Sequence, residues 1–214
     1  MNKGKLYIIS APSGAGKTSL VKQLIANIDQ LTVSVSHTTR KMRTGETHGK
    51  DYFFASVDEF KQMIADHAFL EHAQVFDNFY GTSQRTVEST LEDGIDVILE
   101  IDWQGAKQVR KMLPDCLSIF ILPPSIEILQ QRLESRGQDS KDIIARRMQD
   151  AVNEMSHCNE FDYLIVNDDF NLALAELSSI ISSHRLEKNR QLKILAPLIA
   201  NLIKSDETAH HRET

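Results

Sequence analysis

The chain has 214 residues, a net charge of −6 at neutral pH, and 41% hydrophobic and 25% charged residues. This composition is that of an ordinary globular protein with one sizeable core, and the acidity argues against general binding to nucleic acid or anionic membranes. Two cysteines, Cys116 and Cys158, have no metal-type spacing, and no apolar run approaches the ~20 residues of a membrane span, so we expect a cytoplasmic protein without membrane partners.

Short apolar runs alternate with helical patterns along the chain, which is typical of an α/β protein with a parallel sheet. The run Lys5–Ser10 predicts a buried first strand, and Lys17–Ala26 predicts a helix with one apolar face. Further core strands are predicted at Thr32–Ser36, Asp96–Asp102, Ser118–Leu122 and Tyr163–Asn167.

Between the first strand and the first helix lies the sequence APSGAGKT. It matches the P-loop pattern GxxxxGK[ST] except that alanine replaces the first glycine. Its two glycines let backbone N–H groups surround phosphates, the lysine should reach the β- and γ-phosphates, and the threonine hydroxyl should bind Mg²⁺. The segment therefore predicts a nucleotide phosphate site with Mg²⁺ as cofactor, made by Ala11, Pro12, Ser13, Gly14, Ala15, Gly16, Lys17 and Thr18.

Residues 37–94 are polar and aromatic, unlike the rest of the chain. Ser56 and Glu59 form a capping box for a helix near 57–66. Short strands are predicted at Tyr52–Phe54, Phe69–Phe76 and Phe79–Thr82. We interpret this segment as a β-rich lobe inserted into a core made by residues 4–36 and 95–187.

Two other segments stand apart from the α/β pattern. A polar break at 137–141, between two helices that carry arginines, predicts a short helical lid at about 133–147. The segment 188–214 predicts a lone helix that contains Pro197 and ends in a frayed tail.

The inserted lobe carries candidates for a second substrate site. Arg40 and Arg43 are spaced to surround a phosphate with charged donors, and Glu71 supplies a carboxylate. Glu100 and Asp102 place two acids on one face at the end of a core strand, where open α/β sheets bind ligands.

Seven stretches of the chain, in order over about residues 4–187, resemble the guanylate kinase family of bacterial type. The most specific is TTRKMRTGETHGKDY at 38–52. The resemblance implies a P-loop kinase fold and an enzyme of purine nucleotide metabolism and GMP recycling that transfers the γ-phosphoryl group of ATP to GMP, with GMP bound in the inserted lobe. A homo-oligomer is compatible with it.

The resemblance also implies roles for single residues. The GMP phosphate would be held by Ser36, Arg40, Arg43, Tyr52 and Tyr80, and the base would be read by Glu71, Thr82 and Asp102. Beyond the P-loop, ATP would meet Arg132, Arg136 and Asn167, and the catalytic residues would be Lys17, Arg40, Arg136 and Arg147. Glu100 stands where the family often has aspartate, so it would act on Mg²⁺ only through water.

Three rival functions fit the sequence less well. The guanylate-kinase-like modules of scaffold proteins bind peptides without catalysis, but they typically have a degraded phosphate loop, whereas Gly16, Lys17 and Thr18 are intact here. A P-loop kinase for another nucleotide is disfavoured by Glu71 and Asp102, because a carboxylate accepts the N1–H and N2 amino donors of guanine but meets a bare N1 on adenine. A regulatory GTPase is disfavoured because the chain has no NKxD motif.

Overall fold

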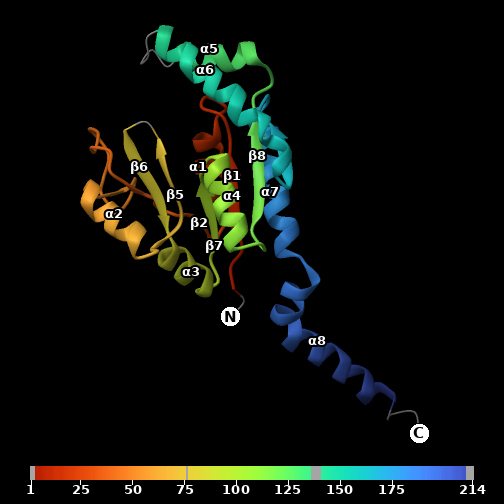
Figure 1. The fold of residues 1–214 in the computed structure, drawn as a ribbon. Helices are drawn as coiled ribbons and strands as arrows, with labels where there is room; N and C mark the ends of the chain where they lie inside the picture. The colour runs from red at the N-terminus through yellow and green to blue at the C-terminus, as the bar shows by residue number, and fades with distance from the viewer. Residues whose placement is uncertain (1–2, 76, 136–140, 211–214) are drawn as a thin grey trace.

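The computed structural model describes residues 3–75, 77–135 and 141–210. Its core is a parallel sheet of five strands in the order β2-β7-β1-β8-β9 (Figure 1). The strands are β1 Leu6–Ser10, β2 Leu31–Val33, β7 Asp96–Glu100, β8 Leu117–Leu122 and β9 Tyr163–Val166. The predicted α/β class with a parallel core sheet flanked by helices is therefore confirmed.

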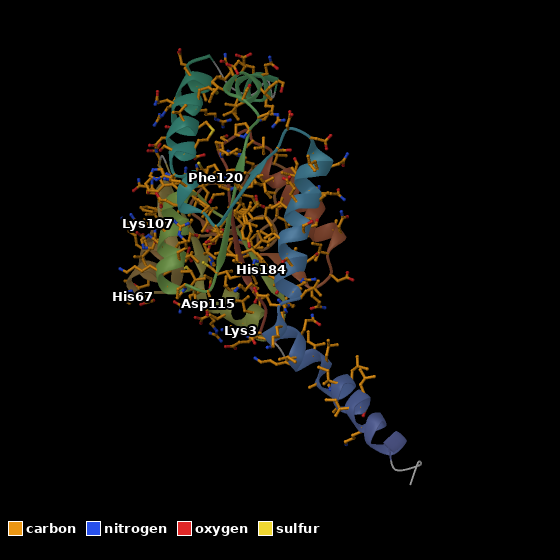
Figure 2. All side chains as sticks on the ribbon, turned by 90° about the vertical axis from the view of Figure 1, so that its right-hand side faces the viewer. Lys3, His67, Lys107, Asp115, Phe120 and His184 are labelled. Atoms are coloured by element: carbon orange, nitrogen blue, oxygen red, sulfur yellow. The ribbon has the colours of Figure 1, made fainter. Side chains whose placement is uncertain are left out.

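Helices cover both faces of the core sheet, and the alternation along β1 shows why its sequence is apolar throughout. Leu6 and Ile8 pack into one cluster, with residues of α3 and α4, while Tyr7 and Ile9 pack into the other, with residues of α1 and α7. A parallel strand buried on both faces needs such a continuous apolar run. Phe120, which belongs to the first cluster, is labelled in Figure 2 among the side chains that fill the interior between the sheet and its helices. The helices are α1 Lys17–Asn27, α3 Gln84–Glu92, α4 Trp103–Met112, α5 Ile126–Ser135, α6 Lys141–Ser156 and α7 Phe170–Arg185.

Two core strands end earlier than the sequence predicted, at Val33 instead of Ser36 and at Glu100 instead of Asp102. β2 ends at Val33, and the chain then crosses to the second sheet, where the Ser36 carbonyl accepts a hydrogen bond from Phe53 N. β7 ends at Glu100, because the Asp102 side chain accepts a hydrogen bond from Gly105 N and caps α4. Both ends lie where the chain leaves the core sheet, and the apolar pattern alone does not reveal that turn.

A second, four-stranded sheet lies beside the core in the order β4-β3-β6-β5 (Figure 1). Its helix α2, Val57–Ala65, begins at the predicted capping box of Ser56 and Glu59. Phe60 of α2 stacks on Phe69 and Phe79, with ring centroids 4.6 and 5.6 Å apart, and this aromatic cluster holds the helix on the sheet. The strands are β3 His37–Thr38, β4 Phe53–Phe54, β5 Phe69–Val75 and β6 Asn78–Ser83.

The carboxyl-terminal helix α8, Lys188–His210, contains Pro197 and projects away from the rest of the molecule (Figure 1). Residues 211–214 of the predicted frayed tail lie outside the described residues. No helix within the described residues is long and apolar enough to cross a membrane.

Asp96 anchors the start of α8 to the core. Its carboxylate is fully buried, accepts a hydrogen bond from Lys5 N at 2.8 Å, and pairs with Arg185 at 2.8 Å and Arg190 at 3.1 Å. Removing one partner of a buried ion pair costs about 3–5 kcal/mol. Because both arginine side chains still reach solvent, we expect Asp96→Asn to lower the free energy of unfolding by about 3 kcal/mol, the lower end of that range, as measured by urea denaturation.

The matched control for this variant is Glu92→Gln, which removes the same charge from an exposed position at the end of α3. Surface substitutions of this kind usually change stability by less than about 0.5 kcal/mol. Equal unfolding midpoints for the two variants would show that Asp96 contributes no more than an exposed acid.

Candidate active site

The phosphate loop follows β1 and ends at Gly16, the residue that caps α1. Gly14 and Gly16 have φ angles of 95° and 92°, a left-handed conformation that side chains rarely adopt. A Cβ atom at Gly16 would also come within 2.4 Å of the Asn167 amide nitrogen. The loop conformation thus depends on glycine at this position for two separate reasons, and it presents backbone N–H groups at a helix N-terminus, where anions bind favourably.

Asn167 supports the phosphate loop, and Arg132 in turn holds Asn167. The buried Asn167 side chain donates a hydrogen bond to the Ala15 carbonyl at 2.7 Å. Arg132 of α5 donates in turn to the Asn167 carbonyl at 3.0 Å. The structure therefore fixes the Asn167 side chain on the loop backbone and places Arg132 against Asn167.

Thr18, in the first turn of α1, lies beside the carboxyl end of β7. Its hydroxyl donates to the Glu100 carboxylate at 3.3 Å. Mg²⁺ prefers oxygen ligands, keeps several waters and is usually bound through one or two protein groups plus substrate phosphates. This hydroxyl–carboxylate pair fits such an ion, and the described residues hold no cluster of three or more acidic, histidine or cysteine side chains suited to a metal.

A cavity of about 170 Å³ lies between the second sheet and the carboxyl end of β7. It brings together most residues predicted for the second substrate. Its lining residues are Ser36, Tyr52, Glu71, Ala73, Tyr80, Glu100, Ile101 and Asp102.

Glu71 is the buried carboxyl group of this cavity and is only 4% exposed. The Thr82 hydroxyl donates to it at 2.5 Å, and Gly105 leaves room for it, because a Cβ atom there would lie 3.0 Å from Glu71 Oε2. Burial raises the pKa of Glu71 to about 7, and the nearby Asp102 adds to the rise, while the Thr82 hydrogen bond opposes it. The cavity thus offers two neighbouring carboxyl groups, one of them costly to ionise unless donors meet it.

Arg40 is held at the edge of the lobe by Glu46, a residue for which the sequence predicted no role. The two guanidinium Nη atoms meet the two carboxylate oxygens at 2.6 and 3.1 Å, and the Arg43 backbone N–H donates to the same carboxylate. The guanidinium also lies 5.4 Å from the Tyr52 ring centroid. This arrangement orients Arg40, whereas the Arg43 side chain is exposed.

Of the two lid arginines predicted to be catalytic, the structure describes only Arg147. Arg147 lies on α6 and is half-buried, while Arg136 lies outside the described residues. The same helix carries Glu154, which the sequence did not single out. Burial raises the pKa of its carboxyl group to about 7, and the charge of Lys17 in the phosphate loop opposes the rise.

A phosphate loop next to a carboxyl-lined cavity is the arrangement that the sequence resemblance implies, and comparison with known proteins decides the family. The family model for guanylate kinase matches residues 3–184. The chain belongs to the guanylate kinase family. A guanylate kinase of Methylococcus capsulatus is 60% identical over 203 residues, which are 95% of this chain and 100% of that protein. One of Hahella chejuensis is 62% identical over 191 residues, covering 89% and 92% of the two chains.

A solved structure agrees with this membership. The crystal structure of guanylate kinase from Anaplasma phagocytophilum superposes with a TM-score of 0.72 at 34% identity, covering 89% of this chain and 90% of that one. The matched region of the family model ends in α7, so α8 lies beyond it.

Proposed function

We propose that this chain is a guanylate kinase enzyme of the cytoplasm, which transfers the γ-phosphoryl group of ATP to GMP and yields ADP and GDP. The observation that carries the proposal is the buried Glu71 carboxyl group, placed with Asp102 in a cavity beside an intact phosphate loop. The family membership and the relatives named guanylate kinase support it. The intact loop favours catalysis over a module that only binds peptides.

Phosphoryl transfer requires alignment and charge neutralisation more than covalent help from the protein. In the proposed complex the loop N–H groups and Lys17 hold the ATP phosphates. Thr18 would bind Mg²⁺, with Glu100 acting through water, and the ion would neutralise charge on the phosphate oxygens. Arg132, Arg136, Arg147 and Asn167 would complete the ATP side.

On the acceptor side, GMP would enter the cavity with its base against Glu71, Thr82 and Asp102. Guanine presents N1–H and an amino group on one edge, and these two donors would meet the Glu71 carboxyl group, which burial leaves in need of partners, and the neighbouring Asp102. The phosphate would then lie toward Ser36, Arg40, Arg43, Tyr52 and Tyr80. The Glu46 ion pair keeps the Arg40 guanidinium in one orientation before GMP arrives.

The test of the function is an ADP-release assay with ATP, Mg²⁺ and each of GMP, dGMP, AMP, CMP and UMP. GMP should be the best acceptor and dGMP should also be used, because no described residue is assigned to the ribose. Turnover of AMP equal to that of GMP would overturn the assignment.

The pKa of Glu71 predicts how GMP binding depends on pH. Burial raises this pKa to about 7 in the free protein, and the two guanine donors favour the ionised form, so they lower it in the complex. GMP binding therefore releases a proton, and the dissociation constant for GMP should rise as the pH falls below about 7. Titration calorimetry between pH 5.5 and 8.5 measures this, and Glu71→Gln should remove that part of the dependence.

A further inference from the structure

The proposed guanine site depends on two carboxyl groups that come from different parts of the fold. Glu71 belongs to β5 of the second sheet, whereas Asp102 caps α4, which packs on the core sheet. α4 also packs against β5 (Figure 1). The position of one carboxyl group relative to the other is therefore set by whatever holds this helix and this strand together.

β5 is the outermost strand of its sheet, and it is irregular just before Glu71. The strand order β4-β3-β6-β5 leaves one side of β5 without a neighbouring strand. The register against β6 shifts between Phe69 and Glu71, so the ladder is interrupted beside the residue that the site requires. An edge strand presents backbone N–H and C=O groups that can bind other parts of the molecule. On this side, the backbone around Glu71 can be fixed only by a partner outside the sheet.

Gln108 of α4 is such a partner. Its side-chain oxygen accepts a hydrogen bond from His72 N at 3.2 Å, and its side-chain nitrogen donates to the His72 carbonyl at 3.0 Å. A primary amide carries the same donor and acceptor as a peptide group, so it pairs with His72 as a residue of a neighbouring strand would. Because His72 directly follows Glu71, this pair fixes the backbone next to the carboxyl group, although Gln108 itself does not line the cavity.

The same face of α4 meets both carboxyl groups one turn earlier. Gly105 donates its backbone N–H to Asp102 at 2.8 Å. A Cβ atom at Gly105 would lie 3.0 Å from Glu71 Oε2. Gln108 comes three residues later, and residues three apart on a helix are neighbours on one face. One turn of α4 is thus next to both carboxyl groups, and the next turn binds the strand that carries one of them.

We propose that Gln108 is a specificity-determining positioning residue for GMP. By binding both backbone groups of His72, it sets the position of Glu71 relative to Asp102. The inference rests on the proposed function, because it requires these two carboxyl groups to meet the base. Guanine presents two donors, N1–H and the 2-amino group, whereas hypoxanthine presents N1–H alone. A loss of alignment between the carboxyl groups therefore weakens binding of GMP more than binding of IMP, its analogue without the amino group.

The experiment replaces Gln108 by methionine, which keeps the length of the side chain and loses both hydrogen bonds. In steady-state assays we expect Gln108→Met to raise KM for GMP about fivefold, the equivalent of about one net hydrogen bond, and to narrow the preference for GMP over IMP in kcat/KM. KM for ATP and kcat should stay within about twofold, which also reports an intact fold. Gln108→Glu should raise KM for GMP at least as much, because a carboxylate has no donor for the His72 carbonyl.

A double-mutant cycle shows whether Gln108 acts through Glu71. In the Glu71→Gln background, Gln108→Met should change KM for GMP by less than about twofold, because effects transmitted through one shared residue are not additive. The control Gln62→Met removes an exposed side-chain hydrogen bond to Asp66 in the same lobe and should alter neither KM nor base preference. Unchanged KM and base preference in Gln108→Met, or an equal effect in both backgrounds, would overturn the inference. Failure of the unchanged chain to phosphorylate GMP would instead overturn the proposed function.

Discussion

Replacing Lys17 by alanine is expected to lower kcat by ~10²-fold or more, because the lysine supplies charge at the transferring phosphoryl group, where lost stabilisation costs several kcal/mol. The fold should persist, since Lys17 is the first residue of α1 and is only half-buried. GMP binding should also persist, because the cavity that contains Glu71 is lined by other residues. Steady-state assays with ATP and GMP measure kcat, and calorimetry with GMP measures binding.

The matched control is Lys22→Ala, which removes the same charge from an exposed position on α1. It should leave kcat and both KM values within about twofold, because exposed charges a turn or more from the site are screened by solvent. If Lys17→Ala retained near-normal turnover, the phosphate loop would be a structural turn in this chain, and the proposed ATP site would have to lie elsewhere.

The core of this fold was predictable because its sequence signals are local. The run around Ile8 and Ile9 is apolar on both faces, and the capping box of Ser56 and Glu59 marks the start of α2 within four residues. The P-loop pattern lies between a strand and a helix, as expected. Each of these features is decided by neighbours in the sequence, so periodicity and capping are sufficient to find them.

The contacts that position the site were harder to predict from the sequence, because they join residues far apart in the chain. Asn167 supports Ala15, and Thr18 contacts Glu100, although more than eighty residues separate the partners in each pair. Glu154 also looks like an ordinary polar position on a helix until its burial is known. Glu46 is the exception, because it lies only six residues after Arg40, within the family-specific stretch at 38–52. Its acidic side chain at that short spacing could have been predicted to pair with Arg40.

The largest change in specificity is expected from Glu71→Gln. The buried carboxyl group lies beside Thr82 and Asp102, and guanine supplies two donors on one edge where adenine presents an unprotonated nitrogen. A site built to hydrogen-bond one group can reject an analogue without it by ~10⁴-fold or more, because its own polar atoms are left unpaired. Glutamine keeps the size but loses the charge, and one of its terminal atoms becomes a donor that opposes the guanine donors.

Glu71→Gln should therefore raise KM for GMP strongly, leave KM for ATP nearly unchanged and narrow the preference for GMP over AMP. Competition assays with both acceptors measure the preference directly. The control is Glu88→Gln on α3, a partly exposed acid whose partner Gln84 is not among the cavity residues, and it should change neither KM. Because Asp102 shares the cavity, Asp102→Asn should add to the effect through the same ligand. Intact GMP affinity and intact base preference in Glu71→Gln would mean that the guanine base is bound by residues other than Glu71.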